Sequence, residues 1–182
     1  MATDRRFCRL TRSREANEFG VLWEEENGMC LSTFLILSPT DRPTSVLLGR
    51  MNPAAPWDHL AGMDAGRVER FRKGWVLPAC QLLLREGPDE AADRLAREWL
   101  GGISPALDSP RIVSEVYAPS GHPDAKRHWD LHFLYRGRIV GPVPAVPGVW
   151  SELRFVDISR TARSEFARSH DQILDLVGLS PG

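Results

Sequence analysis

This chain of 182 residues has few cysteines and no long hydrophobic run, and both absences exclude classes of protein. The three cysteines, Cys8, Cys30 and Cys80, are scattered, and no two of them form the Cys-x-x-Cys spacing of zinc and dithiol redox sites. We therefore expect free thiols in a reducing compartment. The segment from Met1 to Arg14 carries charge throughout and lacks the apolar core of a signal peptide or a membrane anchor. We expect a cytoplasmic protein that does not enter membranes.

The sequence also has no excess of positive or negative charge. The 23 basic and 24 acidic residues nearly cancel, so we expect no general binding of nucleic acid or of anionic membrane surfaces. The sequence also lacks a Walker-type phosphate loop, a Gly-x-Ser-x-Gly elbow, a zinc-ligand spacing and a dinucleotide-binding fingerprint. Length and composition are typical of a globular chain. We expect a lead-in at residues 1–25 and one domain at residues 26–182.

What the sequence does contain is an ordered series of strand and helix signals. Apolar, β-rich runs predict strands at residues 29–37, 45–51, 111–118, 128–135 and 149–158, with a shorter run at 75–78. A helix is predicted from Pro88 to Leu100, because proline suits the first helical position and Gly101 supplies a left-handed stop. An amphipathic helix is predicted at residues 161–177, and a loop at residues 52–66. This order predicts an α/β fold of the α+β kind, with helices on both faces of a mixed central sheet.

Four residues around the first predicted helix stand at intervals typical of one known motif. Glu86, Arg94, Glu98 and Gly101 follow the segment Trp75-Val76-Leu77-Pro78. The pattern resembles the Nudix box, G-x5-E-x7-R-E-U-x-E-E-x-G-U with U aliphatic, which a tryptophan and Leu-Pro commonly precede. The flanking strands extend the resemblance over most of the chain. It implies the α/β/α sandwich of the Nudix hydrolases.

Two of the box carboxylates are replaced in this chain. Leu95 and Trp99 stand where the family has glutamate, Cys80 replaces the opening glycine, and Gly102 replaces the closing aliphatic residue. Nudix enzymes cleave a diphosphate linked to another moiety, and Mg2+ or Mn2+ held by box glutamates neutralises the phosphate oxygens. Positions 95, 98 and 99 span an arc of about 100° on a helix, so carboxylates there would converge on one site. This arc now carries a single carboxylate, that of Glu98.

The resemblance and its departures lead to three interpretations of function. The first is a protein with a degenerate box that binds a nucleotide or another diphosphate-containing ligand and hydrolyses it weakly or not at all. The second is an active, atypical pyrophosphohydrolase of nucleoside diphosphate derivatives that uses Mg2+ or Mn2+, with Glu86 and Glu98 as catalytic residues and metal ligands. It would draw further carboxylates from Asp89, Glu115, Asp130 or Glu152. The third is a non-catalytic interaction domain with Leu95 and Trp99 on its contact surface. A homodimer is a further expectation.

Six residues are candidates for contact with the ligand, and each has a plainer structural alternative. They are Arg94, His128, Asp130, His132, Glu152 and Trp57. Arg94 is alternatively the centre of a solvated Glu90–Arg94–Glu98 ladder, and Glu86 a complement to the helix dipole. The alternating His128, Asp130 and His132 share one strand face, which fits a metal site, a substrate contact, a relocated general base, or a polar solvent-facing side. Trp57 and Trp150 are stacking partners for a base or members of the core.

Overall fold

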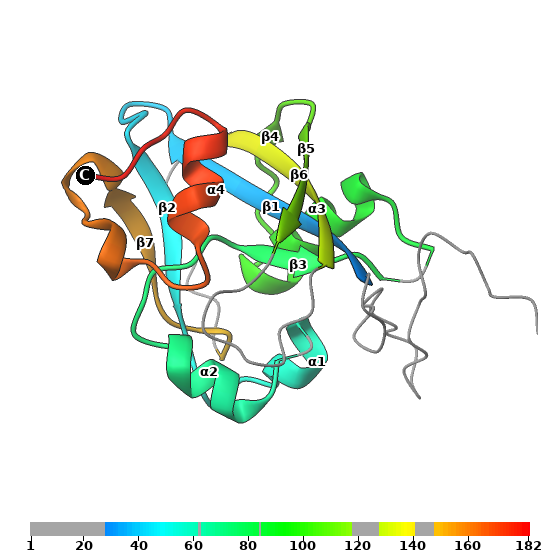
Figure 1. Cartoon of the computed structure of the whole chain (residues 1–182). Coiled ribbons are helices and arrows are strands. Elements are labelled where there is room, and N and C mark those ends of the chain that lie inside the picture. The colour runs from blue at the N-terminus through cyan, green and yellow to red at the C-terminus, as the bar shows by residue number, and fades with distance from the viewer. Residues whose placement is uncertain (1–27, 62, 84, 118–127, 141–147) are drawn as a thin grey trace, which may run out of the picture.

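The computed structural model describes residues 28–61, 63–83, 85–117, 128–140 and 148–182. In this part of the chain a central sheet lies between two helices, and two further short helices lie at one end (Figure 1). The expected lead-in of residues 1–25 lies outside the described residues. None of the helices in the described part has the length and the apolar content that a bilayer span requires.

The central sheet has five strands, with β1 and β6 as its middle pair. Strand β1 (Gly28–Pro39) runs parallel to β6 (His128–Ile139). The antiparallel neighbours are β3 (Ala79–Gln81) beside β1, and β4 (Ala106–Leu107) and β5 (Arg111–Tyr117) beside β6. The sheet is therefore mixed, as predicted, because one parallel pairing stands among antiparallel ones.

A two-stranded antiparallel sheet forms a second β layer. It consists of β2 (Ser45–Met51) and β7 (Trp150–Asp157). Gly49 in β2 bridges to Val76 through two backbone hydrogen bonds of 2.9 Å. A Cβ on Gly49 would lie 2.4 Å from the ring of Trp150, so this position needs glycine for close packing. The bridge ties the segment that leads into β3 to the second sheet.

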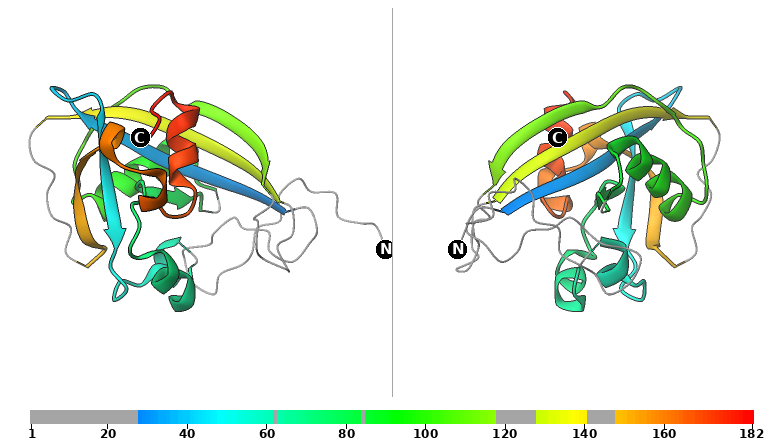
Figure 2. Two further views of the ribbon diagram at one scale, coloured as in Figure 1. Left: turned by 60° about the vertical axis from the view of Figure 1, so that its left-hand side comes forward. Right: turned by 90° about the vertical axis from the view of Figure 1, so that its right-hand side faces the viewer.

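Two helices cover opposite faces of the central sheet (Figure 2). Helix α3 (Pro88–Trp99) packs on the face that carries Leu35, and helix α4 (His170–Leu176) packs on the face that carries Phe34. Successive residues of a strand point to opposite faces, so β1 contributes to both halves of the core. The predicted fold class, a mixed α/β sheet with helices on both faces, is confirmed.

Two short helices occupy much of the segment for which the sequence predicts a loop. They are α1 (Trp57–Ala61) and α2 (Ala65–Phe71). The Asp64 carboxylate accepts a hydrogen bond of 2.8 Å from the Arg67 N–H and so caps α2. The apolar side chains of both helices pack into the core. The loop prediction for residues 52–66 is wrong at these positions, because capping and burial outweigh the proline and glycine signals.

The helix predicted at residues 161–177 is broken. In its place are one 3-10 turn, η2 (Arg163–Glu165), and one short helix, α4, and a further 3-10 turn, η1 (Ile158–Arg160), precedes them. Trp75 donates a backbone hydrogen bond of 2.8 Å to Glu165 and accepts one of 3.0 Å from Ala167. This pairing keeps the chain extended there, because the same backbone groups cannot also close helical turns. The amphipathic pattern predicts burial, and it carries no information about a partner that far away in the sequence.

Candidate functional site

Helix α3, which carries the box residues, begins at Pro88 as predicted and ends at Trp99, one residue before the predicted end. Gly87 is the N-cap, its N–H donates a hydrogen bond of 2.7 Å to Glu90 Oε2, and Pro88 follows at the first helical position. Beyond the other end, Gly101 has a φ of 71°, a left-handed conformation that favours glycine. The helix therefore presents its side chains at the angular positions that the box pattern implies.

Leu95 and Trp99, at the two replaced carboxylate positions, lie in the core. They are 0% and 1% exposed. Both belong to the apolar stripe of α3 that packs on the sheet, together with Ala91, Ala92 and Ala96. The interpretation of Leu95 and Trp99 as a contact surface is wrong, because neither side chain reaches the surface of the protein.

Trp99 belongs to a cluster of three tryptophans. Its ring packs edge-on against Trp57 and Trp150, with centroids 5.2 Å and 5.7 Å apart. The indole N–H of Trp150 donates to the Trp99 carbonyl at 2.8 Å, and that of Trp57 donates to the Asn52 carbonyl at 2.7 Å. Trp57 is 2% exposed and Trp150 is 7% exposed. The expectation that Trp57 and Trp150 stack on a base does not hold in this structure, because both rings are used in the core.

Glu86 and Arg94 form a two-point ion pair across the loop between β3 and α3. Arg94 Nε donates to Glu86 Oε1 at 2.6 Å, and Arg94 Nη2 donates to Glu86 Oε2 at 2.8 Å. Arg94 Nη2 also donates to the Gln81 carbonyl at 2.9 Å, and the Leu83 N–H donates to Glu86 Oε2 at 2.7 Å. The two side chains are only 9% and 11% exposed. The pair thus joins the end of β3, the loop and the helix into one unit.

The surroundings of this pair keep both residues charged. Burial opposes ionisation of Glu86, but the hydrogen bonds from Arg94 and from the Leu83 N–H outweigh it, so the pKa of Glu86 lies below its ordinary value. Burial also disfavours the Arg94 cation, and its hydrogen bonds to Glu86 reverse this effect and raise the pKa of Arg94. Cys80 lies against the pair, and burial raises the pKa of its thiol to about 12. Glu86 is therefore an ionised carboxylate whose charge is already compensated.

Glu98, the remaining carboxylate of the box arc, lies on the exposed side of α3. Its side chain is 42% exposed, and Oε1 is 3.6 Å from Arg97 Nη2. The predicted Glu90–Arg94–Glu98 ladder is not formed, since Arg94 turns to Glu86 and Glu90 caps the helix. Of these two carboxylates, Glu98 is open to solvent, whereas Glu86 is engaged by Arg94.

An open depression of about 360 Å³ lies beside the first turns of α3. Three of its seven lining residues are basic and three are acidic: Arg85, Arg94 and Arg97, and Glu86, Glu90 and Asp93. The oxygens of Glu86 and one oxygen of Glu90 already accept protein hydrogen bonds. In the described part of the chain, no three or more His, Cys, Asp or Glu residues are grouped so that they could hold a metal ion. The residues present therefore do not fit the multi-metal centre that the box implies.

The carboxylates named as further metal ligands lie mostly on the other side of the sheet. Asp130 alternates along β6 with His132 and Leu134, on the face that α4 covers, and Glu115 reaches the same face from β5. The Nε2 of His132 is 3.1 Å from Glu115 Oε1. Asp130 and His132 are 8% and 6% exposed, so they do not form the solvent-facing side that was one expectation. The side chain of His128, the third member of the row, lies outside the described part.

Glu152 is likewise remote from the box helix. It alternates along β7 with Arg154 and Val156, and Val156 packs in the core half beneath α4. Its carboxylate accepts a hydrogen bond of 2.7 Å from Arg154 Nε and is 3.6 Å from Arg50 Nε. Of the four further carboxylates considered, Asp89 alone lies on α3.

Tyr135 is a neighbour of the box helix that sequence reasoning missed. It lies on the α3 side of β6, and its hydroxyl donates a hydrogen bond to the Asp89 carboxylate. Burial and this hydrogen bond raise the pKa of Tyr135. The available signal was the alternation of β6, because Tyr135 falls on the face opposite His132. The contact leaves Asp89, too, engaged with a protein partner.

Known proteins resemble this chain in structure, and none matches it in sequence. No family model matches the chain, and no curated protein matches it. It is similar in structure to the MutT Nudix hydrolase of Burkholderia pseudomallei, with a TM-score of 0.53 and 15% identity over 82% of this chain and 98% of that one.

Two further structures agree. The dihydroneopterin triphosphate pyrophosphohydrolase of E. coli has a TM-score of 0.53 and 14% identity, over 80% of this chain and 92% of that one. A Nudix hydrolase of Nitrosomonas europaea has a TM-score of 0.52 and 14% identity, over 84% of this chain and 92% of that one. Matches at such low sequence identity support the fold alone, and the chemistry has to be inferred from the residues of the site. The fold of this chain is that of the Nudix hydrolases.

Proposed function

We propose that this protein binds a nucleotide or another diphosphate-containing ligand in a Nudix fold and hydrolyses it weakly or not at all. The observation that carries the proposal is the burial of Leu95 and Trp99, which are 0% and 1% exposed. The positions at which the box helix would supply metal-binding carboxylates are thus part of the packing between α3 and the sheet.

The residues that the box retains have a structural role in this chain. Glu86 and Arg94 fix the loop before α3, and Gly101 ends the helix. Of the three arc positions that would hold a metal ion, two now carry Leu95 and Trp99, and Glu98 alone keeps a carboxylate. This division is what we expect of a chain that kept the shape of the site while its catalytic group was lost.

The energetic consequence for hydrolysis is large. A divalent metal ion stabilises the charge that develops at phosphorus by several kcal/mol, and each 1.4 kcal/mol changes a rate by about tenfold. A site with Glu98 exposed and Glu86 neutralised by Arg94 offers little of this stabilisation. Metal-dependent turnover should therefore be several orders of magnitude slower than in a site with a complete set of carboxylates.

An active, atypical pyrophosphohydrolase is the alternative, and the positions of the carboxylates weigh against it. It would draw further carboxylates from Asp89, Glu115, Asp130 or Glu152, of which the last three lie on the α4 side and Asp89, on α3, accepts a hydrogen bond from Tyr135. Mg2+ or Mn2+ therefore enters our proposal as a counterion of the ligand's phosphates rather than as a resident catalytic metal. Cytoplasmic location and a homodimer stay predictions.

Calorimetry and phosphate release on one panel of compounds test the proposal. The full chain is titrated with nucleoside diphosphates and nucleoside diphosphate sugars, with and without Mn2+, and the same mixtures are assayed for products. We expect binding in both conditions and no turnover above that of the buffer. Glu98→Gln should leave both readouts unchanged, as should the control Glu69→Gln on α2.

Two results would contradict the proposal. The first is robust Mn2+-dependent turnover that Glu98→Gln abolishes and Glu69→Gln preserves, which would establish the active enzyme. The second is the absence of any binding across the panel, which would leave the fold without the ligand class that we assign to it.

A further inference from the structure

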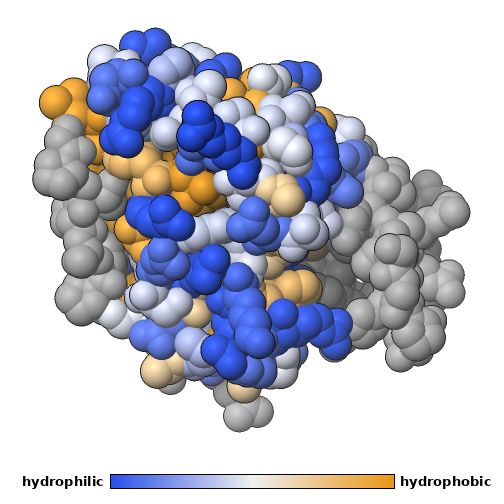
Figure 3. All heavy atoms as spheres, turned by 90° about the vertical axis from the view of Figure 1, so that its left-hand side faces the viewer, coloured by the Kyte–Doolittle hydropathy of each residue, from blue (hydrophilic) through white to orange (hydrophobic). Residues whose placement is uncertain are grey.

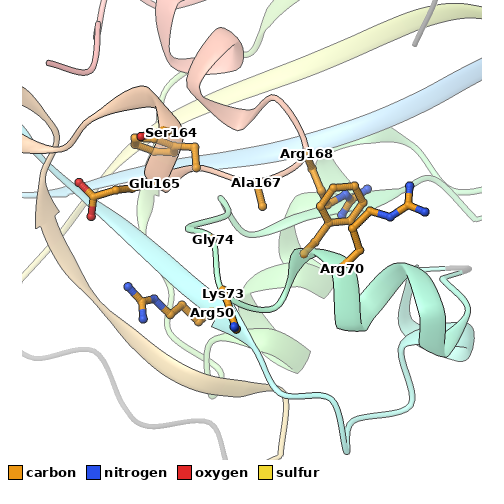
Figure 4. Close-up of a pocket in the computed structure, with 10 residues that line it drawn as sticks. Arg50, Arg70, Lys73, Gly74, Ser164, Glu165, Ala167 and Arg168 are labelled. Carbon is orange, nitrogen blue, oxygen red and sulfur yellow. The ribbon is translucent and has the colours of Figure 1, made fainter. Parts of the chain in front are cut away.

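A second depression, of about 350 Å³, shares no lining residue with the one beside α3 and lies between the end of α2, Gly74 and residues 164–168 (Figure 4). Four of its ten lining residues are basic, namely Arg50, Arg70, Lys73 and Arg168, and one is acidic, Glu165. Figure 3 shows the side of the molecule on which β7 and the segment after it lie, where hydrophilic side chains surround a smaller hydrophobic area. We call this depression the basic pocket.

Three of the four basic side chains of the basic pocket have no acidic partner among the described residues, and the fourth, Arg50, lies 3.6 Å from Glu152. Among the described residues, the side chains of Arg70, Lys73 and Arg168 form no ion pair and no side-chain hydrogen bond. The Glu165 carboxylate accepts a hydrogen bond of 3.0 Å from the Ala162 N–H and points away from Arg70 and Arg168 (Figure 4). Like charges that are held together without counterions attract an anion.

Arg50 and Arg168 are held at the basic pocket in different ways. The guanidinium of Arg50 stacks on the Trp75 ring, 4.4 Å from its centroid, so its direction is fixed by the core. Burial and the neighbouring Arg67 lower the pKa of Arg168 to about 10, which leaves it charged at neutral pH. Arg168 and Ser169 have φ values of 59° and 57°, in the left-handed region that side chains other than glycine rarely adopt. The backbone thus holds Arg168 at the pocket at some cost in conformational energy.

The two walls of the basic pocket are locked to each other. The backbone hydrogen bonds of Trp75 with Glu165 and Ala167, at 2.8 Å and 3.0 Å, join the segment after α2 to the segment before α4. A Cβ on Gly74 would lie 2.6 Å from Ala167 Cβ and 2.8 Å from its backbone nitrogen. The pocket is therefore formed before any ligand arrives, so binding requires little ordering of the protein.

We propose that the basic pocket holds the phosphate groups of a small phosphorylated ligand, which makes it the anion site of the ligand-binding function proposed above, on which this inference rests. The depression beside α3 is a weaker candidate, because its three basic residues face three acidic ones and Arg94 is paired with Glu86. The volume suits a small molecule. Phe71 and Phe166 provide an apolar wall for the rest of the ligand.

A small ligand fits these observations better than a nucleic acid does. The chain as a whole has 23 basic and 24 acidic residues, and the basic side chains of this site line one small depression of about 350 Å³. Binding of a long polyanion depends on a row of several phosphate contacts along a surface. We therefore assign a phosphorylated metabolite and treat an oligonucleotide as a competing outcome of the test.

Matched double variants of the full chain test the assignment by calorimetry with ADP and with inorganic pyrophosphate. Arg70→Gln/Lys73→Gln removes two exposed charges from the basic pocket, and Arg85→Gln/Arg97→Gln removes two exposed charges beside α3. We expect the first to weaken the affinity by about tenfold or more, as for the loss of charge-assisted hydrogen bonds, and the second by less than about twofold. Equal thermal unfolding midpoints establish that both variants are folded.

The outcomes separate this inference from the proposed function. If the α3 variant loses affinity for ADP and the basic-pocket variant keeps it, the ligand binds beside the box helix, and only the present inference is wrong. The same holds if neither variant changes the affinity. If the wild-type chain binds neither probe, both the inference and the proposed function are wrong. Tighter binding of a single-stranded oligonucleotide than of ADP overturns the assignment of a small ligand.

Discussion

Arg94 and Glu86 are joined by two hydrogen bonds of 2.6 Å and 2.8 Å, and the same arginine reaches back to the carbonyl of Gln81 in β3. One side chain therefore connects a strand, a loop and a helix at a place where both partners are largely buried. A pair of this kind is a structural joint, and it accounts for the persistence of these two residues in a box whose metal-binding positions have changed.

Breaking this pair should destabilise the protein strongly. Arg94→Met leaves the Glu86 carboxylate buried without its partner, and we expect a loss of about 3 kcal/mol in the free energy of unfolding. The double variant Glu86→Gln/Arg94→Met should lose less than the sum of the two single variants, because no uncompensated charge remains. Urea unfolding of all four proteins measures the coupling. Strict additivity would show that the pair contributes no more than two separate surface residues.

The lowered pKa of Glu86 also predicts that the free energy of unfolding decreases at acidic pH. Above its ordinary pKa of about 4.5 the carboxyl is ionised in both states, and the ion pair contributes in full. As the pH falls below this value the unfolded chain takes up the proton first, so stability decreases until the folded-state pKa is passed. Urea unfolding between pH 5 and pH 3 should show a shallower decrease for Glu86→Gln than for the wild type. Parallel curves would contradict the assigned ion pair.

Restoring a box carboxylate should not restore an enzyme. Trp99→Glu removes the tryptophan that contacts Trp57 and Trp150 and places a charge in the core. We expect a loss of more than about 3 kcal/mol and no gain of Mn2+-dependent hydrolysis. Trp99→Phe, which keeps an apolar ring, is the control and should lose less. A stable Trp99→Glu variant with metal-dependent turnover would show that this position faces the site after all.

His170 predicts that stability also depends on pH in a less acidic range. Its Nδ1 accepts a hydrogen bond of 2.8 Å from the Leu77 N–H, and burial, together with the charges of Arg168 and His132, holds its pKa well below 6.5. The folded state keeps the ring neutral, while the unfolded chain binds a proton as the pH falls below about 6.5, so stability decreases there. His170→Asn retains an acceptor for the Leu77 N–H and cannot titrate. Thermal unfolding from pH 8 to pH 5 should therefore decline less in this variant, and an identical decline would refute the role of His170.

The wall of the basic pocket depends on a glycine. Gly74→Ala would bring a Cβ to within 2.8 Å of the Ala167 backbone nitrogen, so the two walls must separate. We expect a loss of about 1–3 kcal/mol in stability and weaker binding of ADP. Gly66→Ala is the control, since its Cβ meets only the Asp64 carboxylate, at 3.2 Å, and alanine suits a helix better than glycine. Chemical unfolding and calorimetry of both variants distinguish a local clash from a general effect of the added methyl group.

The sequence by itself determined the elements that are specified locally. Pro88, Glu90 and Gly101 mark the ends of α3 through capping and left-handed backbone, and the alternating strands give the mixed sheet with helices on both faces. The spacing of Glu86 and Arg94 likewise indicated the Nudix fold, which the solved structures support. Such features depend on neighbours within a few residues, so a sequence can show them.

Only the tertiary structure decided which of the candidate residues meet. Trp57 and Trp150 join Trp99 in the core, although nearly a hundred residues separate the first two. Arg50, Lys73 and Arg168 come together because Trp75 pairs with the segment around Ala167, which also breaks the helix predicted there. Contacts of this kind arise from the packing of distant segments, and local propensity and spacing do not contain them.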